Sequence, residues 1–176
     1  MQIITPRLTI RLIRLSDLDA SFAHRSDPEV CRFVGAPITK AQALERLKTF
    51  VKPWQQQEQE KLLLAITLRD DPQLIGELMF KWTHVESRIA EIGYRLGTEF
   101  QGKGYAFEAV NALIEHAFTH LELHKVMAFC VAENSASWRL MQKIGMHKEG
   151  DLSSHFKIGE TWWDAYVFSK INPKHS

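Results

Sequence analysis

The chain has 176 residues, of which 45% are hydrophobic and 24% are charged, a composition typical of one folded domain rather than of a disordered or fibrous protein. Its 22 lysine and arginine residues almost balance its 21 aspartate and glutamate residues, so no bulk field draws the chain to nucleic acid or anionic lipid. We therefore expect neither nucleic acid nor a membrane as a direct partner, and we expect local geometry to hold any ligand.

The N-terminal segment and the cysteines indicate the compartment. The chain is polar by Thr5, without the basic head and apolar run of a secretory signal, and no apolar stretch approaches the roughly twenty residues that cross a bilayer. Cys31 and Cys130 lie far apart in the sequence and do not form a disulfide framework. These features predict a cytoplasmic protein with reduced thiols, folded as a single domain over residues 1–176.

The first half of the chain contains two helix starts and three strand-like segments. Ser16 is predicted to cap a helix with acidic residues in its first turn, and Thr39 with Gln42 forms a capping box that opens a second helix. The apolar face of the second helix is predicted to contain Leu44, Leu47, Val51 and Trp54. Strands are predicted at 8–13, 61–68 and 73–82.

The second half is more regular. Its predicted order is a strand at 89–96, a loop at 97–104, a helix at 105–121, a strand at 125–131, a helix at 135–144 and strands at 146–156 and 161–171. Gly145 follows the shorter helix and suits the left-handed conformation that ends many helices. Because strands and helices do not alternate regularly along the chain, the order predicts a mixed α/β (α+β) layer fold.

A glycine-containing loop, QGKGYA at residues 101–106, stands between a predicted strand and a predicted long helix. Glycine lets the backbone approach a ligand closely, and the free amides of a helix N-terminus suit a phosphate group. A plain strand-to-helix turn is the alternative. The loop is not a P-loop, because no Lys-Ser or Lys-Thr pair follows Gly104, and it lacks the third glycine of a dinucleotide fingerprint.

The loop fits the pattern Gln-x-x-Gly-x-Ala and resembles the pyrophosphate loop of the GNAT acetyltransferases. The segments around it occur in the order and spacing of the branch that contains the RimJ and RimL ribosomal-protein N-terminal acetyltransferases. These segments are TPRL at 5–8, AEIGY at 90–94, NSAS at 134–137, KIGM at 143–146, EG at 149–150 and WD at 163–164. The resemblance extends over about residues 5 to 170.

This resemblance implies a GNAT fold, in which a central mixed, mostly antiparallel sheet is splayed between its fourth and fifth strands and flanked by helices. It implies acetyl-CoA as co-substrate and a primary amine as acceptor. A protein N-terminal α-amine is the expected acceptor, attacking the acetyl group directly in a ternary complex. A homodimer is plausible by the same likeness.

The resemblance also implies roles for individual residues. Leu96 would present its backbone to the pantetheine arm, and the loop would donate backbone amides to the pyrophosphate, with Lys103 either adding a charge or remaining solvated. The implied loop residues are Gln101, Gly102, Lys103, Gly104, Tyr105 and Ala106. Asn134 would hydrogen-bond the pantetheine, or cap a helix instead, and Ser137 would lie near the sulfur.

Amide formation needs an unprotonated amine and a proton for the departing thiolate. An α-amino group ordinarily has a pKa of about 7.7–8.0, so a modest base suffices. Glu91 is the candidate base, with an ion-pair role as the alternative and Glu77 as second choice. Met141 occupies the position where many GNAT enzymes have a tyrosine acid, so Ser137 is the candidate acid; a backbone-satisfied serine, with water as the proton source, is the alternative.

Three other features have more ordinary explanations. His116, His120 and His124 are spaced by four, but the helix is predicted to end at Leu121 and no carboxylate or cysteine completes a set, so no metal site is expected. Cys130 lies in an apolar segment, which predicts a buried, unreactive thiol. For Trp162 and Trp163 we expect a role in core packing or in a dimer contact; lining of the acceptor cleft by one of them is the alternative.

The sequence leaves the acceptor open. Besides a protein N-terminus, a small amine of the polyamine or aminoglycoside kind is an alternative. A non-catalytic acyl-CoA-binding module is another, because Met141 removes the usual acid. A nucleotide-binding domain that prefers ATP or NAD is disfavoured by the segments after residue 130.

Overall fold

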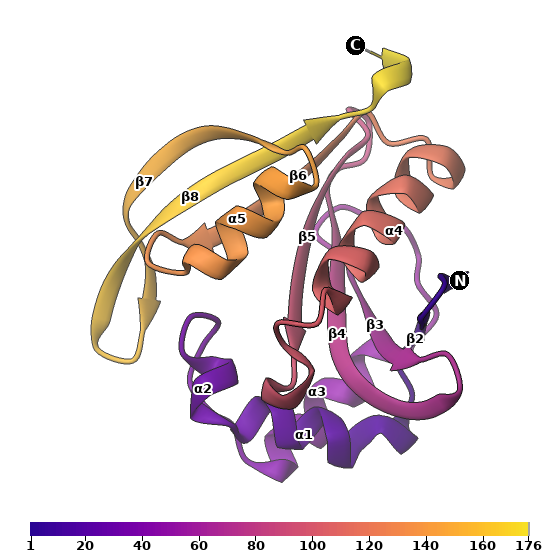
Figure 1. Ribbon diagram of the computed structural model, residues 1–176, viewed down its shortest axis with the longest axis vertical. Helices are drawn as coiled ribbons and strands as arrows, with labels where there is room; N and C mark the ends of the chain where they lie inside the picture. Colours follow the sequence, from indigo (N-terminus) through magenta and orange to yellow (C-terminus); the bar gives the residue numbers. More distant parts are fainter. Residues whose placement is uncertain (176) are drawn as a thin grey trace.

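The computed structural model describes residues 1–175, in which eight strands form one sheet that helices cover on both faces (Figure 1). The strands are β1 (Gln2–Ile4), β2 (Leu8–Leu12), β3 (Lys61–Leu68), β4 (Asp71–His84), β5 (Ile89–Leu96), β6 (Lys125–Val131), β7 (His147–Ile158) and β8 (Thr161–Ile171). The α-helices are α1 (Leu18–Ser26), α2 (Pro28–Cys31), α3 (Lys40–Phe50), α4 (Tyr105–His120) and α5 (Ser135–Lys143).

The sheet has the strand order β1-β2-β3-β4-β5-β6-β8-β7. Its one parallel pair among the described strands is β5 with β6, and this pairing runs only from Ile89 opposite Lys125 to Ile92 opposite Ala128. Beyond Ile92 the two strands separate. Because β1 precedes the first predicted strand, β5 and β6 are the predicted fourth and fifth strands, and the expected splayed, mostly antiparallel sheet is confirmed.

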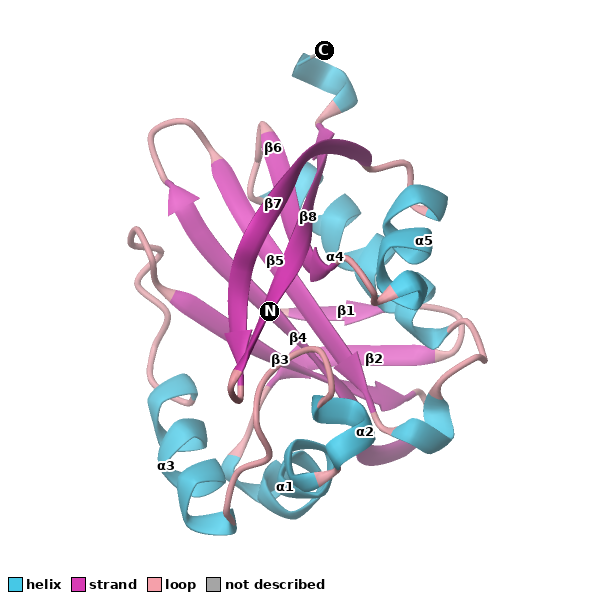
Figure 2. Ribbon diagram, turned by 90° about the vertical axis from the view of Figure 1, so that its left-hand side faces the viewer, coloured by secondary structure: helices cyan, strands magenta, loops and turns pink. Residues whose placement is uncertain are grey.

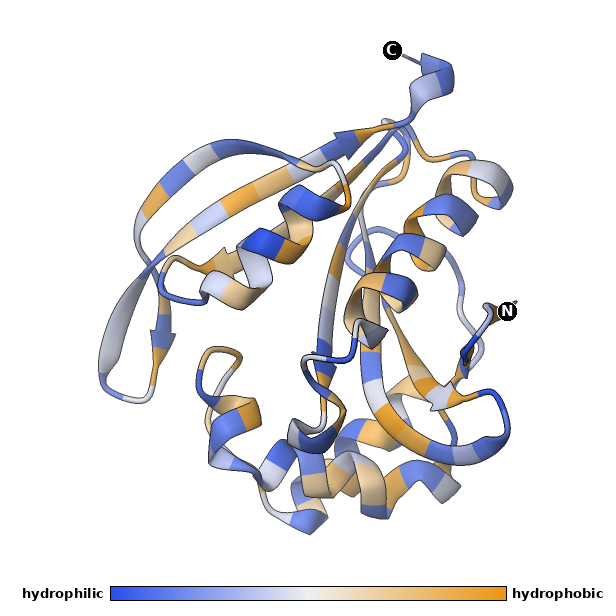
Figure 3. Ribbon diagram, in the orientation of Figure 1, coloured by the Kyte–Doolittle hydropathy of each residue, from blue (hydrophilic) through white to orange (hydrophobic). Residues whose placement is uncertain are grey.

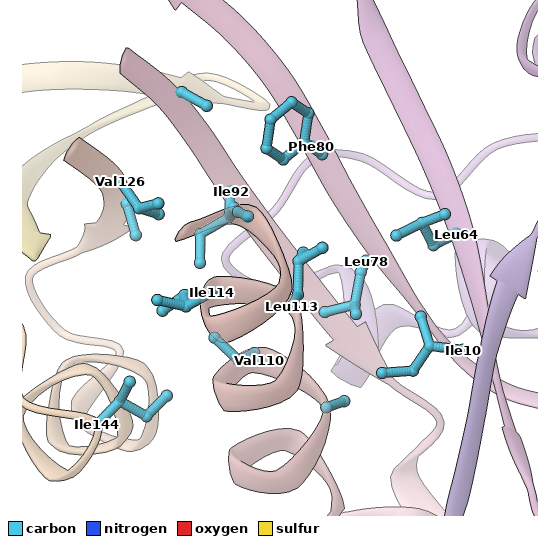
Figure 4. Packing of buried hydrophobic residues seen from close by; sticks show 14 of the residues in the cluster. Ile10, Leu64, Leu78, Phe80, Ile92, Val110, Leu113, Ile114, Val126 and Ile144 are labelled. Carbon is cyan, nitrogen blue, oxygen red and sulfur yellow. The ribbon is translucent and has the colours of Figure 1, made fainter. Parts of the chain in front are cut away.

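Helix α4 is fixed to one face of the sheet by a continuous apolar stripe. Val110, Leu113 and Ile114 are fully buried and point toward side chains of the sheet, including Leu78 and Ile92 (Figure 4). The same face of the helix is coloured as hydrophobic in Figure 3. Since burying one such side chain contributes about 2 kcal/mol, the N-terminus of α4 is held firmly beside the end of β5.

Helices α1 and α3 cover the opposite face at one end of the sheet, as Figure 2 shows. The predicted capping box is present: Thr39 Oγ1 accepts from the amide of Gln42 at 3.3 Å, and Gln42 Oε1 accepts from the amide of Thr39 at 2.8 Å. Leu47 of α3 packs with Leu63 and other residues of a second, smaller core. On β4 and β5, the same face of the sheet is the one opposite α4.

The structure corrects three details of the sequence analysis. Ser16 does not cap α1; it lies in a short 3-10 turn, where the carboxylate of Asp17 accepts from the amide of Arg14 at 2.8 Å and pairs with Arg11. The predicted face of α3 is wrong beyond Leu47, because the helix ends at Phe50: Val51 is 40% exposed, and Trp54 packs against Phe80 from the following loop. Strand β1 and helix α2 are too short to give a periodic signal, and the sequence did not predict them.

Candidate active site

A cleft of about 640 Å³ opens where β5 and β6 separate. On one side it is lined by the loop before α4, the first turn of α4 and the outer face of α5; on the other it is lined by α2 and the turn that follows. Residues 93–96 of β5 form one wall and have no strand partner on the β6 side. Unpaired backbone groups along such an edge can bind an extended, amide-containing ligand.

The glycine loop meets the cleft at the N-terminus of α4. Gly102, with φ 71°, and Gly104, with φ 80°, both adopt the left-handed conformation that glycine tolerates best. Gly104 is the N-cap of α4, and no side chain of residues 1–175 caps the helix there. The first amides of this sixteen-residue helix are therefore available to an anion in the cleft. Gln101, Gly102, Gly104, Tyr105 and Ala106 all line the cleft, as predicted for a pyrophosphate loop.

Arg7, from the segment before β2, holds this loop in place. Its Nε donates to Glu108 Oε2 at 2.6 Å, and its Nη1 donates to the carbonyl of Lys103 at 3.0 Å. Its guanidinium also lies 4.7 Å from the centre of the Tyr105 ring. Thr5 adds a 2.6 Å hydrogen bond to the same Glu108 carboxylate. The N-terminal segment thus braces the outer side of the loop, and Arg7 is a positioning residue rather than part of the cleft lining.

We expect Arg7→Ala to raise the KM for acetyl-CoA about tenfold with little change in kcat, because loss of the hydrogen bond to Lys103 leaves the loop less ordered. Steady-state kinetics with acetyl-CoA as the varied substrate measures this. Arg69→Ala, an exposed arginine at the β3–β4 turn, is the matched control. Equal effects of the two substitutions would contradict the bracing role.

Leu96 and Gln101 are linked within the cleft wall. The side-chain amide of Gln101 donates to the carbonyl of Leu96 at 3.1 Å, which ties the loop to the end of β5. Asn134 is the N-cap of α5: its Oδ1 accepts from the amide of Ser137 at 3.2 Å. Its NH2 group is still available as a donor, and Asn134 lines the cleft. Helix capping and contact with a ligand are therefore compatible.

Ser137 and Tyr94 form a hydroxyl pair inside the cleft. Ser137 Oγ lies 2.8 Å from Tyr94 Oη, which also donates to the carbonyl of Ser137 at 3.2 Å. Burial raises the pKa of Tyr94 to about 12, so this hydroxyl keeps its proton at neutral pH. Met141, at the position of the usual tyrosine, is buried in the main core. Tyr94 reaches the same region from β5, and the sequence alone did not identify it as a site residue.

Cys130 is buried, as predicted, and also lines the cleft. Burial raises the pKa of its thiol to about 11, and a hydrogen bond with Ser137 opposes this shift only in part. The thiol therefore remains protonated at neutral pH and is a poor nucleophile. Trp163 makes an edge contact with Phe33, whose side chain lines the mouth of the cleft, whereas Trp162 is 59% exposed.

The two candidate carboxylates lie on the face of β4 and β5 that turns away from α4. Glu91 is opposite Lys81 in the sheet, and their side chains form a 3.1 Å ion pair. Glu91 does not belong to the cleft lining within the described chain, but Gly93, two residues along the same face, does. Glu77 is 2% exposed and is held by Ser21, Arg25 and Arg95. Because these side chains hold its carboxylate, Glu77 is not available as a catalytic base.

Helix α5, rather than the loop, contributes two of the positive side chains that line the cleft. Arg139 and Lys143, one helical turn apart, both line the cleft on its α5 side. Lys103 is exposed, with its ammonium 5.9 Å from the Phe100 ring centre, and it is not in the lining formed by residues 1–175. The spacing of Arg139 and Lys143 was readable in the sequence, but their direction depends on how α5 packs.

Two features bear on other ligands and on membranes. Within residues 1–175, no group of three or more histidine, cysteine, aspartate or glutamate side chains is arranged to hold a metal ion. No helix in this part of the chain combines the length and the apolarity needed to span a bilayer.

Comparison with known proteins matches this combination of fold and cleft to N-acetyltransferases. A family model described as an acetyltransferase (GNAT) domain matches residues 7–147. YnaD of Bacillus subtilis, an uncharacterized N-acetyltransferase, is 34% identical over 169 residues, which is 96% of each chain. The [ribosomal protein uS5]-alanine N-acetyltransferase of Escherichia coli is 32% identical over 82 residues, 47% of this chain and 42% of that one.

Solved structures agree. A GNAT-family acetyltransferase from Bacillus anthracis superposes with a TM-score of 0.87 at 27% identity, over 98% of this chain and 99% of that one. The fold and cleft are those of an acetyl-CoA-dependent N-acetyltransferase. The chain belongs to the GNAT acetyltransferase family, as the resemblance of its loop and flanking segments predicted. This membership leaves the non-catalytic alternative without support.

Proposed function

We propose that this enzyme acetylates the α-amine of a protein N-terminus by direct attack of the amine on acetyl-CoA, with both substrates bound. The observation that carries the proposal is the cleft itself. It is continuous from the free amides of α4 to the side of β5 at Gly93 and Arg95, so a coenzyme and an acceptor can enter from opposite sides and meet at the splay. Holding both reactants in one orientation supplies much of the rate enhancement in such reactions.

The chain's residues divide into those that bind the coenzyme and those that act on protons. The amides of residues 102–106 suit the pyrophosphate, the free edge of β5 up to Leu96 suits the pantetheine amides, and Asn134 adds a donor. Arg139 and Lys143 complement the remaining phosphate charge. Lys103 contributes only its backbone amide.

Ser137 is the proposed proton donor to the departing thiolate, with Tyr94 behind it. The two hydroxyls are 2.8 Å apart, so a proton lost from Ser137 can be replaced from Tyr94, which lines the cleft and regains its proton from solvent. Because an ordinary thiol has a pKa of about 8.5, the thiolate is a fair leaving group and needs only modest assistance. Glu91 is the proposed base, acting on the acceptor amine through water, because its carboxylate is on the acceptor face but outside the cleft lining.

A peptide acceptor is favoured by the similarity to the [ribosomal protein uS5]-alanine N-acetyltransferase, whose name gives an alanine of a ribosomal protein as its acceptor. Measuring thiol release over a panel of N-terminal peptides, polyamines and aminoglycosides tests this proposal, with mass spectrometry locating the acetyl group. We expect peptides to be acetylated on the α-amine. Turnover of polyamines or aminoglycosides with none for the peptides would contradict it.

We expect Glu91→Gln to lower kcat about tenfold or more at pH 7 and to leave acetyl-CoA affinity unchanged, because the amide keeps the shape of the side chain but cannot accept a proton. Lys81→Gln is the matched control, since it breaks the same ion pair and keeps the carboxylate. Steady-state kinetics from pH 6 to 9 compares the two variants. If both substitutions lower kcat equally, Glu91 acts only as an ion-pair partner.

A further inference from the structure

The acceptor side of the cleft ends in a cluster with more positive than negative charge. At its centre is Glu77, each of whose carboxylate oxygens accepts a hydrogen bond from a protein donor. Glu77 Oε1 accepts from the hydroxyl of Ser21 at 2.6 Å, and Oε2 accepts from the guanidinium of Arg25. Arg95 Nε lies 3.7 Å from the same Oε2 atom, which is close enough for charge attraction and too far for a hydrogen bond.

Two arginines of this cluster have donors that no protein group uses. Within residues 1–175, the buried Nε of Arg25 has no hydrogen-bond partner, although the side chain of Arg25 is only 7% exposed. In the same part of the chain, no protein group accepts a hydrogen bond from the guanidinium of Arg95, which lines the cleft and is 17% exposed. A guanidinium offers five N–H donors, and a nearby anion is its usual partner.

Arg95 keeps its positive charge although its side chain is mostly buried. Burial, followed by the positive charge of Arg25, lowers the pKa of Arg95 to about 10, so its guanidinium remains protonated at neutral pH. Arg25 and Arg95 thus bring two positive charges to the one carboxylate of Glu77. An excess of buried positive charge is costly unless an anion joins it.

We propose that Arg95 binds a carboxylate of the acceptor, so that the preferred substrates carry a carboxylate near the amine to be acetylated. The proposal rests on the function proposed above. Arg95 lies on the same face of β5 as Gly93 and about 7 Å from it, so an amine at the splay and a carboxylate one or two residues away fit this spacing. An acidic side chain near a peptide N-terminus and the carboxylate of a free amino acid offer the same chemistry.

Matched substrates test this site. The first pair of peptide amides differs only at the second residue, aspartate or asparagine, and the second pair is free alanine and alanine amide. We expect kcat/KM for the aspartate peptide to be about tenfold higher, as for a charge-assisted hydrogen bond, and the advantage to shrink with added salt. A preference for free alanine over its amide, with no preference between the peptides, would support the carboxylate site and assign it to a small acceptor.

A variant pair separates recognition from folding. Arg95→Gln should reduce the ratio of kcat/KM values for the aspartate and asparagine peptides several-fold. Lys48→Gln removes a positive charge from α3, where Lys48 is 52% exposed and pairs with Glu45, and should leave the ratio unchanged. Equal kcat/KM values within both substrate pairs would overturn the carboxylate site alone. Acetylation of a polyamine with none of the peptides or alanine would overturn the proposed function as well.

Discussion

Replacing Gly104 with valine should raise the dissociation constant for acetyl-CoA by about a hundredfold or more. At φ 80° a β-branched residue is strained by about 1–3 kcal/mol, whereas its Cβ atom would lie 3.4 Å from Nη2 of Arg7, which a flexible side chain accommodates. Relief of the backbone strain turns the amides at the start of α4 away from the cleft. Losing two hydrogen bonds to a charged group accounts for the expected factor.

The thermal shift that acetyl-CoA induces measures this effect, since a ligand that binds only the folded state raises the melting temperature. Gly159→Val is the matched control. Gly159 also has a positive φ, 60°, in the turn between β7 and β8, and no atom lies within 4 Å of its Cβ position. Gly159→Val therefore introduces the same kind of backbone strain at a position outside the cleft. A Gly104→Val enzyme that keeps its shift with acetyl-CoA would show that the pyrophosphate does not bind this loop.

Ser137→Ala should lower kcat by about a hundredfold, the range in which general acids contribute, and Tyr94→Phe by about tenfold. Alanine removes the hydroxyl that faces the cleft, whereas phenylalanine leaves Ser137 in place and removes the 2.8 Å contact behind it. The KM for acetyl-CoA should change little in either variant, because the cap from Asn134 to the amide of residue 137 does not involve the serine hydroxyl.

Pre-steady-state thiol release measures the chemical step in these variants, with Ser135→Ala as the control for an exposed serine in the first turn of the same helix. A Ser137→Ala enzyme with the kcat of the parent would show that water protonates the thiolate. A change confined to KM would assign Ser137 to coenzyme binding instead.

The sequence predicted the fold where local and long-range signals agreed. Residues 89–96 and 125–131 match β5 and β6 at both ends, because buried strands combine an apolar run with clear boundaries. The helix start predicted at Ser16 was wrong. Asp17 accepts a hydrogen bond from the backbone of Arg14 and pairs with Arg11, and this local competition displaces the helix start. Trp54 was wrongly predicted on the helix face, because its packing on Phe80 is a tertiary contact that helical periodicity does not contain.

The binding loop could be predicted from sequence, but the proton donors and the acceptor side could not. Positive φ values at Gly102 and Gly104 follow from a local motif. The pairing of Tyr94 with Ser137 joins residues 43 positions apart and exists only because β5 and β6 separate. The cluster around Glu77 likewise depends on α1 packing over β4 and β5, which no local pattern encodes.

Titration calorimetry with acetyl-CoA, and with ATP as the comparison ligand, tests whether the cleft binds the coenzyme. We expect one acetyl-CoA site per chain, weakened by Gly104→Val and retained in Ser137→Ala. Binding of ATP with no heat from acetyl-CoA, or acetyl-CoA affinity that is unchanged by Gly104→Val, would contradict the assignment of the cleft between β5 and β6 as the coenzyme site.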